Sequence, residues 1–137
     1  MAKLLLEIVT PVERIFSGEV DEVVIPGIEG ELGILPEHSP LLTQVTPGEL
    51  RYRQGTKENR MAIGEGFAEV TPAQVSLLTD LAVDEADIDE QQVQEAIRRA
   101  EATMREPHIG GEELAFVQAS LEKSLAQLRV KRKRHIH

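Results

Sequence analysis

Short apolar runs, each only a few residues long, alternate with turn-forming residues through the first 84 positions of the chain. The runs are rich in Val, Ile and Leu, and glycine or proline often interrupts them at intervals of about 8–12 residues. Many short runs with regular turn signals are typical of an antiparallel β-sandwich or barrel. The pattern predicts strands over residues 4–9, 19–25, 41–45, 50–53, 61–63, 67–70 and 75–79.

A helical pattern replaces the strand pattern from residue 85 onward. Asp87 followed by Glu90 resembles a capping box that opens a helix. Apolar residues then recur every three or four positions, first at Val93, Ile97, Ala100 and Met104 and then at Leu114, Val117, Leu121, Leu125 and Leu128. Pro107 and two following glycines separate these stripes, so the pattern predicts an antiparallel hairpin of two amphipathic helices. Because each stripe is narrow, the hairpin should lean on another surface.

The two patterns together predict an α+β fold that is mainly β in its N-terminal part. Residues 1–84 form an antiparallel β-sandwich, and residues 85–137 form a C-terminal antiparallel two-helix hairpin. A chain of 137 residues with 41% hydrophobic side chains can bury one small core and carry an appendage. It has neither an apolar run of about 18–20 residues nor a leader-like segment. We therefore expect a protein that works in the compartment where it is made.

Net charge narrows the range of partners. The 24 Asp and Glu outnumber the 15 Lys and Arg, and a formal charge of −9 disfavours general nucleic-acid binding because phosphates would be repelled. Three Phe, one Tyr and no Trp leave little for stacking on bases. The chain nevertheless ends in a basic segment with Arg129, Lys131, Arg132, Lys133 and Arg134. By composition alone this end binds something negative, whether a protein, a membrane surface or a nucleic acid.

The sequence shows no pattern for catalysis or for metal binding. The absence of cysteine excludes disulfides, thiolate catalysis, Fe–S clusters and Cys-based zinc sites. Gly27, Gly30 and Gly33 indicate tight turns between strands and not a phosphate cradle, because no helix start follows them. His38 lies between two prolines without an acidic partner at a useful spacing. We therefore expect a non-enzymatic module with no catalytic residue, no metal and no cofactor.

Residues 24–43 carry a family resemblance. They read Val-Ile-Pro-Gly-Ile-Glu-Gly-Glu-Leu-Gly-Ile-Leu-Pro-Glu-His-Ser-Pro-Leu-Leu-Thr, which resembles the signature of the ε subunit of bacterial and chloroplast F-type ATP synthases. Further similar stretches occur at residues 9–11, 64–70, 118–120 and 125–130, so the resemblance covers essentially the whole chain. The order of parts in that family, a β-sandwich followed by two helices, is similar to the order predicted here.

The resemblance implies a place in the F1 central stalk and no catalytic role. In the family the sandwich binds the γ subunit and sits on the ring of c subunits, which helps to couple rotation to ATP synthesis in the α/β hexamer. On the matching positions, Glu29, Glu31 and Leu32 would contact the c ring, and His38 and Ser39 would contact γ. The resemblance also implies a peripheral protein at the cytoplasmic face of the bacterial inner membrane, attached to the membrane only through the complex and without a nucleic-acid partner.

The helical hairpin resembles the regulatory element of the family. That element either folds against the sandwich or extends beside γ into the α/β hexamer, where it inhibits ATP hydrolysis. In the extended state the basic end of the hairpin faces an acidic segment of the β subunit. The residues placed for that contact here are Lys123, Arg129, Lys131, Arg132, Lys133 and Arg134.

Some members of the family bind ATP on the hairpin through an I/L-D-x-x-R-A motif, and this chain departs from it. Residues 88–93 read Ile-Asp-Glu-Gln-Gln-Val, so Gln92 and Val93 replace the arginine and the alanine. The loss of a guanidinium removes a charge-assisted contact to phosphate. Asp89, Arg98 and Arg99 are the residues that would hold ATP if it bound, and we expect that it does not bind.

Another class of function fits the composition equally well. A free-standing factor with a β-sandwich and a helical hairpin could regulate a different macromolecular machine by reaching into its channel. The block over residues 24–43 separates this alternative from the ATP synthase subunit.

Overall fold

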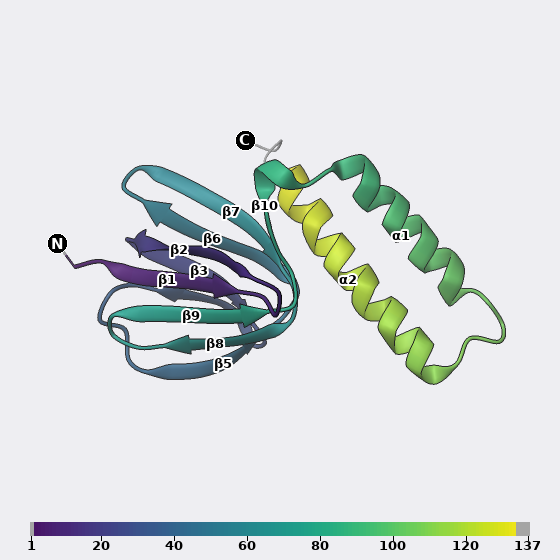
Figure 1. Cartoon of the computed structure of the whole chain (residues 1–137), viewed down its shortest axis with the longest axis horizontal. Coiled ribbons are helices and arrows are strands. Elements are labelled where there is room, and N and C mark those ends of the chain that lie inside the picture. The colour runs from purple at the N-terminus through teal and green to yellow at the C-terminus, as the bar shows by residue number, and fades with distance from the viewer. Residues whose placement is uncertain (1, 134–137) are drawn as a thin grey trace.

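Strands, one short 3₁₀ turn and two α-helices follow one another in the computed structural model, which describes residues 2–133. The strands are β1 (Leu4–Val9), β2 (Arg14–Val20), β3 (Glu22–Gly27), β4 (Gly30–Ile34), β5 (Leu41–Val45), β6 (Gly48–Gln54), β7 (Lys57–Ile63), β8 (Gly66–Val70), β9 (Gln74–Thr79) and β10 (Ala82–Asp84). The turn η1 (Glu85–Asp87) leads into α1 (Glu90–Met104) and α2 (Gly111–Lys133). The predicted α+β architecture, a β-sandwich followed by two helices, is confirmed (Figure 1).

The strands surround one apolar core. Their order in the sheet is β10-β7-β6-β3-β5-β8-β9-β1-β2, with β4 paired to β3, and the pair Gly27–Val45 joins the two halves. Alternate residues of each strand point inward, so Leu4, Leu6 and Ile8 of β1 are fully buried. Among residues 2–133, the parallel pair of β1 and β9 is the one exception to the antiparallel pairing that the sequence predicts.

Each predicted strand except one lies within an observed strand, although β7 begins four residues earlier than predicted and the first five residues of β2 lie in no predicted strand. The predicted strand over residues 19–25 is wrong, because the chain bends at Asp21 and the segment divides between β2 and β3. Asp21 stabilises this bend by accepting hydrogen bonds from Lys3 Nζ and Gly55 N, both at 2.6 Å. β4 lies in the glycine-rich stretch for which the sequence indicates only turns, and there it pairs with β3. The short strand β10 has three residues, too few for periodicity to reveal.

The two helices lie antiparallel, and α2 is the one that packs against the sandwich (Figure 1). The predicted capping box at Asp87 is misplaced, because Asp87 belongs to η1. Asp89 is the N-cap of α1, where its side chain accepts a hydrogen bond from Gln92 N (3.2 Å). Pro107 falls between the end of α1 and the start of α2, where the sequence predicts the break.

A small apolar group, here called the docking cluster, anchors the hairpin on the sandwich. It consists of Ala62 of β7, Ile88, Val93 of α1 and Val130 of α2, all of them buried. Ala126, one helical turn before Val130, is fully buried as well. These α2 residues lie on the side of the helix away from the predicted stripe at Leu114–Leu128, whose side chains are only half-buried. α2 therefore uses one side for α1 and another for the sandwich.

We expect Gly66→Ala to lower the free energy of unfolding by about 1–3 kcal/mol, the usual cost of overpacking. Gly66 pairs with Thr79 across β8 and β9, and a Cβ atom there would collide with the backbone carbonyl oxygen of Leu78. Gly111→Ala is the matched control, because nothing lies within 4 Å of a Cβ at that position. Unfolding in urea measures both variants, and equal free energies of unfolding would contradict the prediction.

Candidate functional site

The turn between β3 and β4 presents two carboxylates to solvent. Gly30 has a φ of 127° in this turn, a conformation that side chains of L-residues rarely allow. Glu29 and Glu31, which the family resemblance assigns to the c ring, are both exposed here. Leu32, assigned to the same contact, is half-buried and packs against the sandwich core. The two glutamates therefore project from the sandwich, with Leu32 as the support beneath them.

Arg51 of β6 ties Glu31 to the sheet. Its Nη1 donates hydrogen bonds to Glu31 Oε2 (2.9 Å) and Glu49 Oε1 (3.0 Å). The side chain of Glu49 is only 10% exposed, and its second carboxylate oxygen lies 3.9 Å from Arg60 Nε. Partial burial opposes the charge of Arg51, but the hydrogen bonds to Glu49 and Glu31 raise the pKa of its guanidinium above the usual value. Sequence reasoning missed Arg51, because its partner Glu31 is 20 residues away in the chain and only the tertiary structure brings the two together.

The loop over residues 35–40 carries the two residues assigned to γ. It follows β4 at the end away from the β3–β4 turn, so the two assigned sets lie at opposite ends of this strand. Glu37 has a φ of 71°, and its backbone N–H donates to the carbonyl oxygen of Pro72 (2.7 Å). His38 is half-buried with its Nδ1 2.8 Å from the carbonyl oxygen of Ser39, and Ser39 is exposed. The loop is thus tied to the β8–β9 turn and presents Ser39 beside the start of β5.

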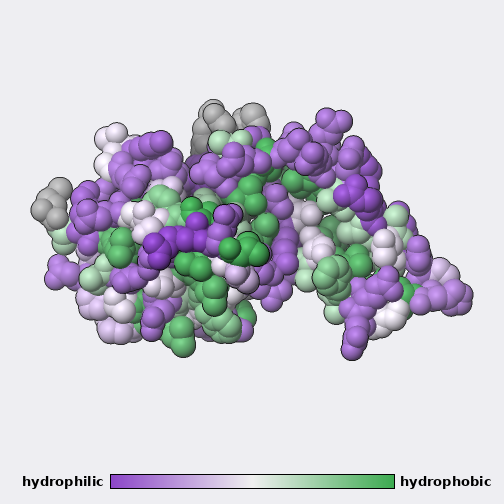
Figure 2. Space-filling model, in the orientation of Figure 1, coloured by the Kyte–Doolittle hydropathy of each residue, from purple (hydrophilic) through white to green (hydrophobic). Residues whose placement is uncertain are grey.

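Three large apolar side chains lie together on the outer side of β5, β8 and β9. Leu42, Phe67 and Leu78, here called the apolar face, are 70%, 51% and 53% exposed. Phe67 pairs directly with Leu78, and Leu42 lies on the neighbouring strand on the same side of the sheet. Hydrophobic side chains gather over this part of the sandwich in Figure 2. Large apolar side chains that gather on an exposed surface indicate a site that binds another molecule.

Sequence reasoning missed the apolar face, although the sequence holds a signal for it. Leu41 precedes Leu42 and Leu77 precedes Leu78, so both sides of these strands carry leucine. A strand with one solvated side alternates between apolar and polar residues. Leucine on the outer side therefore indicates a face that another surface covers.

The basic residues assigned to the β subunit lie along the C-terminal half of α2, and most of those described are already engaged within the chain. The contacts are Lys123 Nζ to Asp80 Oδ2 (2.7 Å), Lys131 Nζ to the carbonyl oxygen of Glu85 (3.3 Å) and Arg132 Nε to Glu90 Oε1 (3.1 Å). Arg129 lines a cleft instead. The side chain of Lys133 and the whole of Arg134 lie outside the described residues.

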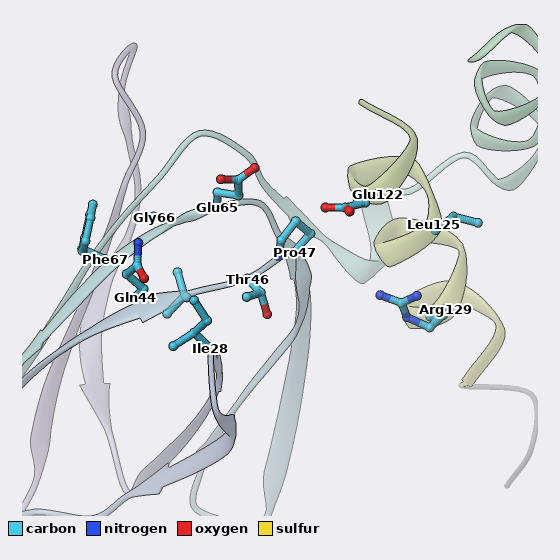
Figure 3. A pocket seen from close by; sticks show the side chains of 11 residues that line it. Ile28, Gln44, Thr46, Pro47, Glu65, Gly66, Phe67, Glu122, Leu125 and Arg129 are labelled. Atoms are coloured by element: carbon cyan, nitrogen blue, oxygen red, sulfur yellow. The ribbon is translucent and has the colours of Figure 1, made fainter. Parts of the chain in front are cut away.

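A cleft of about 620 Å³ separates the sandwich from α2 (Figure 3). Glu122 and Arg129 point toward it from α2, and Ile28 and Phe67 line it on the sandwich side. Ile28 belongs to the β3–β4 turn, and Phe67 belongs to the apolar face. The cleft therefore joins these two surfaces to the charged side of α2.

A second cleft, of about 560 Å³, lies at the base of the hairpin and contains two of the three residues named for ATP. Asp89 and Arg99 line this cleft, whereas Arg98 is not among its lining residues. One carboxylate oxygen of Asp89 already caps α1, and Asp87 and Glu95 add negative charge around the single guanidinium. This excess of negative charge opposes binding of the phosphate groups of ATP, as does the loss of the arginine from the I/L-D-x-x-R-A motif.

Among residues 2–133, no group of three or more histidine or acidic side chains is placed to hold a metal ion. No helix in the same part of the chain is long and apolar enough to cross a bilayer. The described surfaces are an acidic turn, an apolar sheet face and a basic helix end. They define a class of protein: a module with a β-sandwich and a helical hairpin that exposes surfaces of the kind that bind other proteins.

Comparison with known proteins gives the family. Residues 3–85 match the β-sandwich domain of the ATP synthase delta/epsilon chain, and residues 86–132 match the long α-helix domain of that chain. The ATP synthase epsilon chain of Dehalococcoides mccartyi is 45% identical over 100% of this chain and 98% of its own length. That of Syntrophobacter fumaroxidans is 43% identical over 96% and 97%. The chain therefore belongs to the ATP synthase delta/epsilon family, as a non-catalytic epsilon chain.

Solved structures agree with this assignment. One similar chain comes from the mitochondrial ATP synthase of Euglena gracilis, solved with OSCP, F1 and the c ring. It superposes with a TM-score of 0.79 at 26% identity, and the match covers 100% of the present chain and 83% of the Euglena chain. A chain in the central stalk and c ring structure of the Tetrahymena thermophila mitochondrial enzyme superposes with a TM-score of 0.59 at 11% identity over 94% of this chain, which shows the shared fold alone. The resemblance carried by residues 24–43 is thus confirmed over the alternative of a factor for another machine.

We expect Arg51→Met to lower the free energy of unfolding by about 1–3 kcal/mol, because the substitution removes the cation nearest to the largely buried Glu49. Arg53→Met, on the same side of the same strand, is the matched control. The contacts of Arg53 with Asp21 and Glu22 are 3.8 and 3.7 Å long and more exposed, so its loss should stay below about 1 kcal/mol. Urea unfolding at neutral pH measures both variants, and an equal loss in the two would contradict the network described above.

We expect the isolated chain to bind no ATP at millimolar concentration, since acidic side chains surround Arg99 in the hairpin cleft. Titration calorimetry with Mg-ATP should give only heat of dilution, and small-angle scattering should show no compaction. A saturable signal in that range would refute this expectation.

Proposed function

We propose that this chain is the epsilon subunit in the central stalk of a proton-translocating F-type ATP synthase. There it helps to couple rotation of the c ring and γ to ATP synthesis, and its hairpin inhibits ATP hydrolysis when extended. Family membership over residues 3–132 supports this role. The observation that carries it is the pairing of a rigid sandwich, which exposes contact surfaces, with a hairpin anchored by a small docking cluster. A rigid part can transmit torque, and a lightly anchored part can move.

The apolar face is the surface that we assign to γ, together with His38 and Ser39. Ser39 lies just before β5, and Leu42 of that strand is the most exposed member of the apolar face. An apolar centre with polar residues beside it is the usual anatomy of a stable interface between subunits. Burial of Phe67 and Leu78 against γ would remove from water the apolar surface that the isolated chain exposes, which favours binding.

The acidic turn is the surface that we assign to the c ring. Glu29 and Glu31 project from the β3–β4 turn, and Arg51 of β6 restrains Glu31 from across β3. Because the side chain of Glu31 is already restrained, it loses less conformational entropy when it binds the c ring. The similar chain in the Euglena gracilis structure comes from an assembly solved with F1 and the c ring, which supports this placement.

The basic residues of α2 are the ones that we assign to the β subunit in the α/β hexamer. In the extended state Lys123, Arg129, Lys131 and Arg132 would face acidic side chains of β. Three of these four contact oxygen atoms of acidic residues of the chain itself in the docked state. Carboxylates of a partner would offer these cations the same kind of charge-assisted contact.

Such a subunit is peripheral. We place it at the cytoplasmic face of the bacterial cell membrane, held there only through the γ subunit and the c ring. The bacterial epsilon chains at 45% and 43% identity support the bacterial setting.

Deletion of residues 131–137 from the assembled enzyme should raise ATP hydrolysis by about fivefold or more, the lower end of the usual coupling between two sites. This truncation removes Lys131 and Arg132 but keeps Val130, so the docking cluster stays complete. Steady-state ATPase activity of the purified complex measures the effect. Deletion of residues 85–137 sets the maximum, and Lys57→Gln on the sandwich is the control for loss of a distant cation. Unchanged hydrolysis in a fully assembled complex would contradict the inhibitory role.

A further inference from the structure

One ion pair links the middle of α2 to the sandwich. Lys123 Nζ lies 2.7 Å from Asp80 Oδ2, and the two side chains are 28% and 42% exposed. Lys123 precedes the fully buried Ala126 by three residues, so both lie on the side of α2 that faces the sandwich. The ion pair therefore lies at the boundary between the buried contact and solvent, where water and salt reach it.

The turn that carries Asp80 is held rigidly. The backbone N–H of Asp80 donates to the carbonyl oxygen of Glu65 (3.1 Å), and the buried hydroxyl of Thr79 accepts a hydrogen bond from Gly64 N (3.1 Å). Gly64 also makes room for the carboxylate, because a Cβ at that position would collide with Asp80 Oδ1. The sandwich thus fixes the acceptor, and α2 brings the cation to it.

We propose that Lys123 and Asp80 form an electrostatic latch that holds α2 on the sandwich and keeps Lys123 from an outside acidic partner. The docking cluster supplies the apolar part of the contact, and the latch supplies a part that salt or a competing carboxylate can weaken. Exposed ion pairs are weak and are screened by salt, so this contact opens reversibly. The latch is a property of the chain itself, and only the identity of the competing partner rests on the proposed function.

The partner that the latch opposes is an acidic protein surface. Lys123, Lys131 and Arg132 are all engaged by oxygen atoms of the chain in the docked state. Of these contacts, the one between Lys123 and Asp80 joins α2 to the sandwich, so a partner that presents carboxylates to Lys123 must take this cation from Asp80. Binding of the partner and undocking of the hairpin are then coupled, and each favours the other.

Thiol labelling of the whole chain tests the latch, because the native sequence has no cysteine. Ala126→Cys places a thiol in the buried contact between α2 and the sandwich, where labelling requires undocking. At low ionic strength, Asp80→Asn and Lys123→Met in this background should each raise the labelling rate by about two- to fivefold, the range for an exposed ion pair. The two substitutions together should raise it no further than either alone. High salt should raise the rate of the parent and leave the double variant nearly unchanged.

Three controls keep the outcome interpretable. Arg14→Met breaks an ion pair inside the sandwich, with Glu7 at 3.6 Å, and should not change the labelling rate. A thiol at Ala68→Cys in the sandwich core reports global unfolding and should stay protected in every variant. If Ala126→Cys itself undocks the hairpin, Val130→Cys reads the same contact from the docking cluster. Equal labelling rates for the parent and Asp80→Asn, or additive effects in the double variant, would overturn the latch.

A second arm separates the latch from the proposed function. In the assembled ATP synthase, Asp80→Asn should lower ATP hydrolysis, because it releases the hairpin toward the extended state. If the labelling rates rise as expected but hydrolysis is unchanged, the latch stands and the inhibitory function fails. If the labelling rates do not rise, the latch is wrong whatever the hydrolysis assay gives.

Discussion

Burial of the docking cluster is the contact on which the relation between the two parts of this protein depends. Two narrow amphipathic helices are only marginally stable as a hairpin on their own, so α1 and α2 need a surface to lean on. Ala62, Ile88, Val93 and Val130 provide it by excluding water between β7 and the ends of both helices. Because few residues take part, the contact holds the hairpin on the sandwich but leaves it able to undock.

Charge is distributed around this contact in a way that the overall value of −9 conceals. The acidic sandwich and helix start supply Asp80, Glu85 and Glu90, and the basic end of α2 meets them in the docked state. Within the sandwich, Glu49 and Glu31 share the guanidinium of Arg51, which ties the acidic turn to the sheet. The same kind of interaction therefore has two uses, one that fixes a projecting turn and one that holds a movable element.

The sequence predicted most elements of the fold, since strands and helices with clear periodicity follow local physical chemistry. β1 and β5 have the predicted bounds, and the break between the helices lies at Pro107. The errors in the predicted strands occurred where the local sequence signal was weak or fitted both a turn and a strand. The bend at Asp21 depends on Lys3 and Gly55, which are distant in the chain, and β4 forms because it pairs with the edge of β3. Local patterns cannot show such long-range hydrogen bonds.

The sequence by itself determined the class of the fold, the two-part organisation and, through residues 24–43, the family. Only the tertiary structure decided which surfaces exist. The apolar face requires three strands to lie side by side, and the Arg51 network requires β4, β6 and β7 to meet. The contact of Lys123 with Asp80 requires α2 to dock. Each of these features joins residues that are far apart in the chain, and the register and packing that bring them together follow from burial of the whole core.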